Sequence, residues 1–275
     1  MQVVGNGEHG ADAKSIAPIS VIIPCYQCTD TLFRALNSAL HQTLQPSEII
    51  LIDDASGDGT LEMLLQYEKK HFSLIKVIAQ NKNGGPGMAR NAGWEVASQP
   101  WLAFLDADDE WHPRKLEIQW SWLSAHPEVS LCGHGTRLSD GQHEHVDEAA
   151  VASTTLTTLQ MLFSNRLPTR SVMLRRDLPF RFMGKDVTED YLLWLQIILA
   201  GFSAQRMELC LAYSLRPDFS PGGYSGQLWR HEKRELAAMR VLRSDGKLSW
   251  PIWFLAASWS CIKYLRRRFL RRQLK

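Results

Sequence analysis

The chain has 275 residues, with 31 Lys and Arg against 29 Asp and Glu, and its formal net charge is +2. An apolar content of 45% excludes a wholly disordered protein, and 18 Gly and 12 Pro without a repeat exclude a collagen-like one. The five Cys are few and odd in number, which argues against a disulfide scaffold and indicates a reducing, cytoplasmic compartment.

Short apolar runs alternate with stretches of helical periodicity through the first half of the chain. Residues 1–17 form a polar lead-in without the apolar segment of a signal peptide. The pattern then predicts strands at 19–23, 48–52, 74–79 and 101–105, and helices at 31–41, 61–68, 88–97 and 113–125. Strands that are apolar on both faces and separated by helices predict a mostly parallel sheet, flanked by helices, in an α/β domain.

The second half is less regular. We expect strands at 128–133 and 171–174, a polar loop at 139–152, and a helix at 188–199 with Thr188 as its N-cap. A loop rich in Pro and Gly then precedes a charged amphipathic helix at 228–242. We therefore divide the chain into the lead-in (1–17), the α/β domain (18–216) and a C-terminal helical appendage (217–275).

Two predicted strands end in acidic residues. Asp53 and Asp54 follow one strand, and Asp106, Asp108 and Asp109 follow another. Ligands of parallel sheets bind at the carboxyl ends of the strands, and carboxylates are suitable ligands for Mg²⁺ or Mn²⁺ that also binds substrate phosphates. The acids therefore indicate a site for a cation and a nucleotide. A solvated acidic loop is the alternative.

The sequence around these acids is similar to a known family. Its segments are ISVIIPCYQCTDTLFRALNSALHQTLQPSEIILIDDASGDGT, NGGPGMARNAGWEVASQPWLAFLDADDEWHPRKLEIQ and FMGKDVTEDYLLWLQIILAG. They resemble the family 2 glycosyltransferases over about residues 18–216, most specifically in the first hundred of these. The resemblance implies the GT-A fold, that of nucleotide-diphospho-sugar transferases, and sugar transfer with inversion from a nucleoside diphosphate sugar.

The same resemblance implies roles for the residues that follow the first strands. Tyr26, next to Pro24, matches the aromatic residue that stacks on the base of the donor. Asp53 matches the acid that hydrogen-bonds the base, while Asp54 contacts the nucleotide or braces its loop. Arg90 either contacts the nucleotide or pairs with Asp53.

The D-x-D of the resemblance is Asp106, Ala107 and Asp108. Asp106 matches the ribose and metal contact, with Ala107 beside it in the nucleotide-sugar site. Asp108 matches the direct ligand of Mg²⁺ or Mn²⁺, and we expect Asp109 to support the site from behind or to cap a helix. Arg216 resembles a position near the active-site lid that reaches the diphosphate.

Glu189 and Asp190 match the acid pair of the family. Inversion by one in-line displacement requires a general base for the acceptor hydroxyl on the face opposite the leaving diphosphate. Asp190 matches this base, with Glu189 as the second candidate. Acids in the first turn of a helix are also favoured by its dipole without any catalytic role, which is the alternative for both.

Other chemically suggestive residues are weaker candidates. Cys25 and Cys28 form a C-x-x-C without a second pair at zinc-binding spacing, so we treat them as bystanders. His134, with the histidines and acids at 143–148, indicates a solvated loop more than a metal site. The glycine-rich segment at 84–87 lacks the Lys-Ser/Thr of a phosphate-binding P-loop.

The C-terminus has a composition of its own. Residues 263–275 contain seven Lys and Arg and no acid, which leaves 24 bases and 29 acids, a net charge of −5, in residues 1–262. Aromatic residues precede and interleave these bases, and the apolar stretch at 250–262 is shorter than the roughly 20 residues of a membrane span. We expect a helix lying on an anionic membrane surface, with a core-packing helix and a nucleic-acid-binding tail as alternatives.

Taken together, these features predict a metal-dependent transferase on the cytoplasmic face of a membrane. It would move one sugar to a glycan or lipid-linked acceptor in surface polysaccharide or lipopolysaccharide synthesis, without a nucleic-acid partner. A nucleotidyltransferase that forms the sugar nucleotide, and a non-catalytic glycan- or nucleotide-binding scaffold at the membrane, are the alternatives. The former usually carries a basic glycine-rich loop after its first strand, where this chain has PCYQCTDT.

Overall fold

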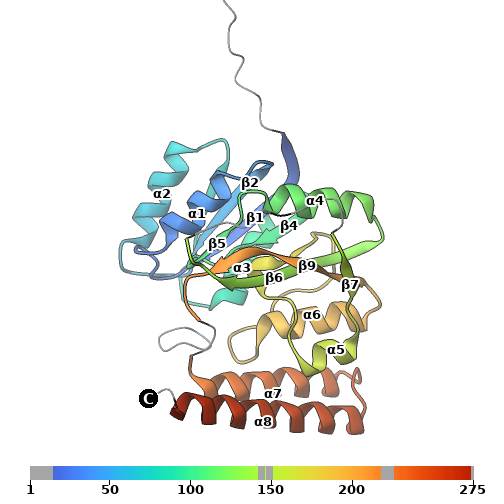
Figure 1. Ribbon diagram of the computed structural model, residues 1–275. Helices are drawn as coiled ribbons and strands as arrows, with labels where there is room; N and C mark the ends of the chain where they lie inside the picture. Colours follow the sequence, from blue (N-terminus) through green and yellow to red (C-terminus); the bar gives the residue numbers. More distant parts are fainter. Residues whose placement is uncertain (1–14, 142–145, 147–150, 218–225, 274–275) are drawn as a thin grey trace, which may run out of the picture.

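The computed structural model describes residues 15–141, 146, 151–217 and 226–273 (Figure 1). Most of the predicted lead-in, and residues 143, 145, 147 and 148 of the predicted polar loop, lie outside these residues. Described strands form one mixed sheet in the order β3-β2-β1-β4-β8-β6-β9-β5, with β7 paired to β9.

The first half of the chain builds the parallel part of the sheet by regular strand–helix alternation. Its elements are β1 (Ile16–Cys25), α1 (Leu32–Leu40), β2 (Gln45–Asp53), α2 (Thr60–Lys70), β3 (Ile75–Ala79), α3 (Pro86–Val96) and β4 (Trp101–Phe104). β2 and β4 pair with β1, and β3 pairs with β2, all in parallel. Each of the strands and helices predicted here is present, which places the ends of β1, β2 and β4 at one edge.

The second half adds strands in both directions. Its elements are β5 (Asp109–Trp111), α4 (Lys115–Ala125), β6 (Val129–Leu138), β7 (Ser153–Thr155), α5 (Thr158–Phe163), a 3₁₀ turn η1 (Thr169–Ser171), β8 (Met173–Arg175), α6 (Glu189–Leu199), β9 (Ser203–Ser214), α7 (Leu228–Ser244) and α8 (Trp250–Gln273). β8 is antiparallel to β4 and β6, whereas β9 is parallel to β6 and antiparallel to β5 and β7.

Several of these elements were not predicted from the sequence. β9 is a strand of 12 residues whose burial does not alternate regularly, because β6, β5 and β7 contact different parts of it. The helix predicted at 188–199 is α6, but the hydroxyl of Thr188 is buried and makes no hydrogen bond in the structure, so it is not a side-chain cap.

The sheet separates two hydrophobic clusters, which explains why its strands are apolar on both faces. Ile22 of β1 belongs to one cluster, whereas its neighbours Val21 and Ile23 belong to the other. Helices α1, α2 and α4 cover the second cluster, and α3, α5 and α6 cover the first (Figure 1). The two layers of helices cover the faces of the sheet and leave the carboxyl edge of the parallel strands accessible to a ligand.

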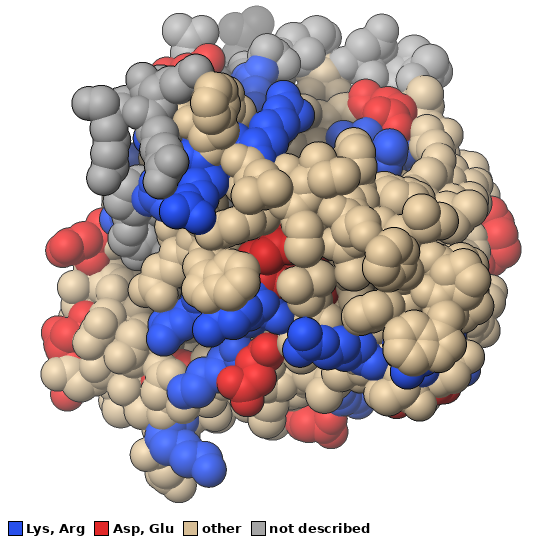
Figure 2. Space-filling view, turned by 90° about the horizontal axis from the view of Figure 1, so that it is seen from below, with Lys and Arg blue, Asp and Glu red and all other residues tan. Residues whose placement is uncertain are grey.

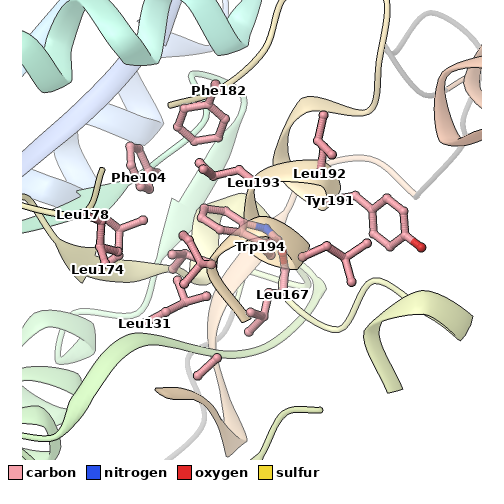
Figure 3. Packing of buried hydrophobic residues seen from close by; sticks show 14 of the residues in the cluster. Phe104, Leu131, Leu167, Leu174, Leu178, Phe182, Tyr191, Leu192, Leu193 and Trp194 are labelled. Atoms are coloured by element: carbon pink, nitrogen blue, oxygen red, sulfur yellow. Dashed lines mark hydrogen bonds between the residues drawn. The ribbon is translucent and has the colours of Figure 1, made fainter. Parts of the chain in front are cut away.

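Aromatic packing fixes the position of α6 (Figure 3). The ring of Trp194 lies 6.4 Å from that of Phe104 and 5.8 Å from that of Phe182, measured between centroids. Its indole Nε1 donates a hydrogen bond of 3.1 Å to the carbonyl of Leu167. Since α6 begins with Glu189, this cluster sets where the two predicted catalytic acids lie.

α7 and α8 form a helical hairpin that packs below α6 (Figure 1). Ala238, Met239 and Leu242 of α7 and Ala256 of α8 are buried in the same cluster as α6. No helix in the described part of the chain combines the length and apolar character needed to cross a membrane.

Candidate active site

A cleft of about 940 Å³ opens at the carboxyl ends of β1, β2 and β4. It continues past the first turn of α6 to the helical hairpin, so one end is formed by the sheet and the other by α7 and α8. Of the residues predicted to form the site, ten line this cleft: Pro24, Tyr26, Asp54, Arg90, Asp106, Ala107, Asp108, Glu189, Asp190 and Arg216. The structure therefore brings them together from six separate parts of the chain.

Tyr26 and Pro24 lie at the end of β1. The Tyr26 side chain is 48% exposed, which is unusual for a large ring beside a core strand and leaves its face open to a ligand. The next residue, Gln27, has a positive φ of 47°, and its amide donates to the hydroxyl of Ser56. This turn is thus held to the segment after β2, and Tyr26 remains free for stacking on a planar group.

Asp53 and Asp54 have different environments although they are neighbours. Asp53 is buried outside the cleft lining, and its carboxylate accepts hydrogen bonds from the hydroxyl (2.5 Å) and amide (3.4 Å) of Ser56. Asp54 lines the cleft and accepts from the amides of Gly84 (2.9 Å) and Gly85 (2.8 Å). Asp54 therefore braces the glycine-rich loop, which was one of the two roles considered for it.

The backbone conformation at position 85 of that loop favours glycine. Gly85 has a φ of 86°, and a Cβ there would lie 3.3 Å from Cβ of Lys185. Burial raises the pKa of Asp54, and the two loop amides oppose that rise. The loop and Asp54 thus form a preorganised wall at the sheet end of the cleft.

Arg90 of α3 connects the acids of the sheet edge to those of α6. Its guanidinium lies 2.5 Å from Asp106 and 3.5 Å from Glu189, and the residue is buried. The ion pair with Asp53 that we considered is not formed, because Asp53 faces Ser56 instead. Arg90 thereby fixes the distance between the D-x-D and the first turn of α6.

The acids after β4 are concentrated in little space. Burial and the nearby carboxylate of Asp106 raise the pKa of Asp108. Burial raises the pKa of Asp109 to about 7, with Asp106 and Asp108 adding to the rise and Arg170 opposing it across 3.0 Å. Asp109 begins β5, lines the cleft and pairs with Arg170, so it does not cap a helix.

The carboxylates that follow β4 suit a divalent cation that also binds the phosphates of a substrate. In the described part of the chain, no three His, Cys, Asp or Glu residues form a ready-made metal cage. Asp106 and Asp108 both line the cleft and offer carboxylate oxygens from the same turn after β4. Mg²⁺ typically binds through one or two carboxylates together with substrate phosphates, which matches this arrangement.

Glu189 and Asp190 open α6 but are not equivalent. Burial raises the pKa of Glu189 to about 7, with Asp190 contributing and Arg90 opposing. The carboxylate of Asp190 faces the cleft, where it accepts hydrogen bonds from Asn165 (3.3 Å) and Thr169 (3.1 Å). A cleft-facing, oriented carboxylate is suited to accept a proton, whereas Glu189 is committed to Arg90.

Asn165 and Thr169 were missed by the sequence analysis. They lie between α5 and β8, in the part of the chain where the resemblance is loose, and no motif spacing marks them. Arg216, which follows β9, lies within electrostatic range of Asp108 and lowers its pKa. Its expected contact with a diphosphate stays a prediction.

The far end of the cleft was not predicted at all. Six of its lining residues belong to the helical hairpin: Arg230, His231, Arg234, Glu235, Lys263 and Arg267. Glu235 is central to this end, with its carboxylate 2.7 Å from Lys263 and 3.8 Å from His231. The charged periodicity of α7 was visible in the sequence, but its partner helix was needed to know which face lines the cleft.

The weaker candidates among the Cys and His residues are buried. Cys25 and Cys28 are free thiols near the end of β1, and both belong to the residues that line the cleft. His134 is fully buried, with Nδ1 2.8 Å from the carbonyl of Gly135, and burial lowers its pKa to about 3. It is a neutral core histidine.

Comparison with known proteins identifies relatives. The family model for glycosyl transferase family 2 matches residues 20–178. TuaG of Bacillus subtilis, a glycosyltransferase assigned to teichuronic acid biosynthesis, is 29% identical over 90% of this chain and 94% of its own length. WfaP of Escherichia coli, a UDP-Glc:α-D-GlcNAc-diphosphoundecaprenol β-1,3-glucosyltransferase, is 30% identical over 71% of this chain and 76% of its own.

Solved structures share the fold at lower identity. The 1–349 fragment of Staphylococcus aureus TarS, in complex with UDP-GlcNAc, is 20% identical with a TM-score of 0.66, and the match covers 91% of this chain and 72% of TarS. The mannosyltransferase PcManGT of Pyrobaculum calidifontis, with GDP-Man and Mn²⁺, is 19% identical with a TM-score of 0.65, over 89% and 73% of the two chains. The fold is therefore GT-A, as predicted.

Proposed function

The chain belongs to glycosyl transferase family 2, and on that premise we propose that it is an inverting, metal-dependent enzyme of surface polysaccharide synthesis. It moves one sugar from a nucleoside diphosphate sugar to a glycan or lipid-linked acceptor. Two of its relatives support this, since one is assigned to teichuronic acid biosynthesis and another acts on a diphosphoundecaprenol-linked sugar. Family membership decides against a nucleotidyltransferase.

The observation that carries the proposal is the chain of charges through the cleft. Asp108 stands at one end beside Asp106, Arg90 joins Asp106 to Glu189, and Asp190 follows with its carboxylate facing the cavity. One cavity thus contains a carboxylate suited to bind a cation, that of Asp108, and a carboxylate suited to accept a proton, that of Asp190. The ion pairs of Arg90 hold the two parts of the site at a fixed distance. In-line transfer requires this division of roles.

The residues of the chain would act as follows. Tyr26 stacks on the base, while Asp53 and Asp54 form the loop framework around it. Asp108, with Asp106, would hold Mg²⁺ or Mn²⁺, which supplies charge compensation for the departing diphosphate. Arg216 adds a positive charge on the same side.

On the acceptor side, Asp190 takes the proton of the attacking hydroxyl. Asn165 and Thr169 orient its carboxylate, since both donate hydrogen bonds to Oδ2. The other oxygen accepts from the amide of Tyr191 at 2.7 Å. Attack from this face, opposite the diphosphate, inverts the anomeric carbon.

We further propose that α8 contacts an anionic membrane surface on its cytoplasmic side. Several large apolar side chains on it are exposed: Trp250, Phe254, Leu255, Trp259, Ile262, Leu265, Phe269 and Leu270. Arg266 and Arg268 are exposed among them, whereas Lys263 and Arg267 turn inward to Glu235. The basic run is therefore divided between the surface and the cleft.

A donor screen tests the enzymatic proposal. The full chain with Mn²⁺ is offered UDP-, GDP- and dTDP-sugars, and release of free nucleoside diphosphate is measured for wild type, Asp108→Ala and Asp190→Asn. Glu62→Gln, on the exposed side of α2, is the matched control for removal of an acid. We expect release with one donor and loss of release in both site variants.

Other outcomes are equally informative. Loss in Asp108→Ala alone would keep the metal site and move the base to Glu189. If no donor is turned over, donor binding decides: binding that needs Mn²⁺ supports an enzyme whose acceptor is missing. Absence of any donor binding would contradict the proposal and favour a non-catalytic scaffold.

A further inference from the structure

Charge is distributed unevenly along the cleft. At the sheet end, four acids and three cations line it: Asp54, Asp106, Asp108 and Asp109 with Arg90, Arg170 and Arg216. At the hairpin end, the lining contributed by α7 and α8 contains four cations and one acid. We call Arg230, Arg234, Lys263 and Arg267 the cationic wall. A positive surface facing a substrate cavity indicates an anionic ligand.

The wall lies next to the proposed base. The amide of Thr188, directly before α6, donates 3.3 Å to the carbonyl of Arg234. Lys263 and Arg267 influence His231 electrostatically, as does Asp190, so all four groups lie close together. The wall therefore lies near Asp190, the residue that we propose as the base for the acceptor hydroxyl.

Part of this charge is already balanced. Glu235 pairs with Lys263 at 2.7 Å and lies 4.0 Å from Arg267. Burial would raise the pKa of Glu235, yet Lys263, His231 and Arg267 hold it below its ordinary value. This pair anchors α8 to α7, and the wall continues along α7 through Arg234 to the exposed Arg230.

A second cavity of about 530 Å³ adjoins these two arginines. It is lined by Lys185, Asp186, Arg230, Lys233 and Arg234, which is four cations with one acid. Lys185, Arg230 and Arg234 line both cavities, so the two share a rim. Arg guanidinium groups suit phosphate because they form paired, charge-assisted hydrogen bonds.

The same face of the molecule carries the exposed apolar side chains of α8. Figure 2 shows Lys and Arg side chains gathered beside a broad surface without charge. Trp259, one of these exposed residues of α8, donates from Nε1 to the carbonyl of Phe163, two residues before Asn165 at the cleft. A ligand with a charged group and an apolar chain would meet both features at once.

From these observations we propose that the cationic wall, with Lys185 and Lys233, binds the diphosphate of a lipid-linked acceptor. This rests on the proposed transferase function and specifies its acceptor: a sugar attached to a lipid through a diphosphate. The sugar hydroxyl reaches Asp190, the diphosphate contacts Arg230 and Arg234, and the lipid runs along α8. The donor diphosphate stays at the opposite end, beside Asp108 and Arg216.

Binding of farnesyl diphosphate, a soluble prenyl diphosphate without a sugar, tests the proposal directly. The full chain is titrated with it calorimetrically, with and without saturating UDP, GDP or dTDP and Mn²⁺. Farnesol is the control ligand without phosphates. We compare wild type, Arg230→Gln, and Arg230→Gln combined with Arg234→Gln. Arg240→Gln, at an exposed position of α7 outside both cavities, is the matched control variant.

Farnesyl diphosphate should bind to wild type with the nucleotide present, and farnesol should bind much more weakly. Loss of one charge-assisted contact should weaken binding about tenfold, and the double variant should lose more. Arg240→Gln should bind as wild type does. Thermal unfolding of each variant checks the fold, and Arg230→Gln, which alters an exposed side chain, keeps the test decisive if the double variant unfolds.

Three results would overturn the inference. Unchanged binding by both site variants would remove the wall as the site, and displacement of the ligand by nucleotide would place it at the donor end. Displacement of farnesyl diphosphate from the protein by phosphatidylglycerol vesicles would show that the wall binds membrane headgroups. Failure of the donor screen is separate from all three, because this binding is measured without sugar transfer.

Discussion

The two ends of the cleft are built in different ways. At the sheet end, chemistry follows directly on secondary structure: Tyr26 and Asp54 each lie just after a strand, and neighbouring parallel strands bring them together. At the hairpin end, Asp190, Arg230 and Lys263 come from three helices far apart in the sequence. Local sequence pattern therefore determines the sheet end, and long-range packing determines the hairpin end.

The largest expected effect concerns the junction of these two ends. Asp190→Asn should lower kcat by about 10²- to 10⁴-fold, since a general base contributes on this scale, while the donor KM stays the same. Glu189→Gln should lower kcat less, because Glu189 holds Arg90 and does not face the acceptor. Steady-state kinetics of both variants measures the difference. The reverse order of effects would assign the base to Glu189.

This junction also shows how far sequence reasoning reached. Glu189 and Asp190 were found because a motif precedes an apolar helix, and the D-x-D because it follows a buried strand. Asn165 and Thr169, which orient Asp190, have no local signature and are placed by β8 and η1. β9 escaped prediction because its three partner strands give it an irregular burial pattern.

The hairpin illustrates the same limit for charge. The seven bases of residues 263–275 form one block in the sequence, and we assigned them one role. In the structure, Lys263 and Arg267 lie over Glu235, whereas Arg266 and Arg268 are exposed. Helical periodicity could have separated them only if the packed face of α8 had been known.

The next largest effect concerns stability and arises from the aromatic cluster that holds α6 in place. Trp194→Ala should reduce the free energy of unfolding by about 3–5 kcal/mol, because it removes a fully buried ring between Phe104 and Phe182. Urea unfolding followed by circular dichroism measures this. Phe72→Ala, at a position that is 84% exposed, should change the free energy by less than about 0.5 kcal/mol. Equal losses in both would show that α6 is not anchored by this cluster.

The pH dependence of the free energy of unfolding should reveal the buried carboxyl group of Glu189. The pKa of Glu189 is raised to about 7 from an ordinary value of 4.5, so the folded state binds its proton more tightly. The resulting stabilisation is fully present below about pH 4.5 and is lost as pH rises through 7, a change of about 1–3 kcal/mol.

Glu189→Gln cannot lose this proton, so it should be more stable relative to wild type at pH 8 than at pH 5. Unfolding in urea at both pH values gives the comparison, with Glu62→Gln as the control on an exposed acid. The same difference between pH 5 and pH 8 in wild type and Glu189→Gln would contradict the assignment.

The smallest effect separates the two faces of α8. Deletion of residues 248–275 would remove Lys263 and Arg267 from the cleft together with the apolar surface, so it cannot test membrane contact alone. Phe254→Ser changes only an exposed side chain, 63% accessible, and should weaken partitioning to vesicles with anionic lipids about tenfold, from the lost burial of one ring. Vesicle sedimentation measures it. Phe72→Ser, an equally apolar change outside the hairpin, should leave partitioning unchanged. If both variants partition as wild type does, the apolar face of α8 does not contact the membrane. The main role of α8 would then be to line the cleft.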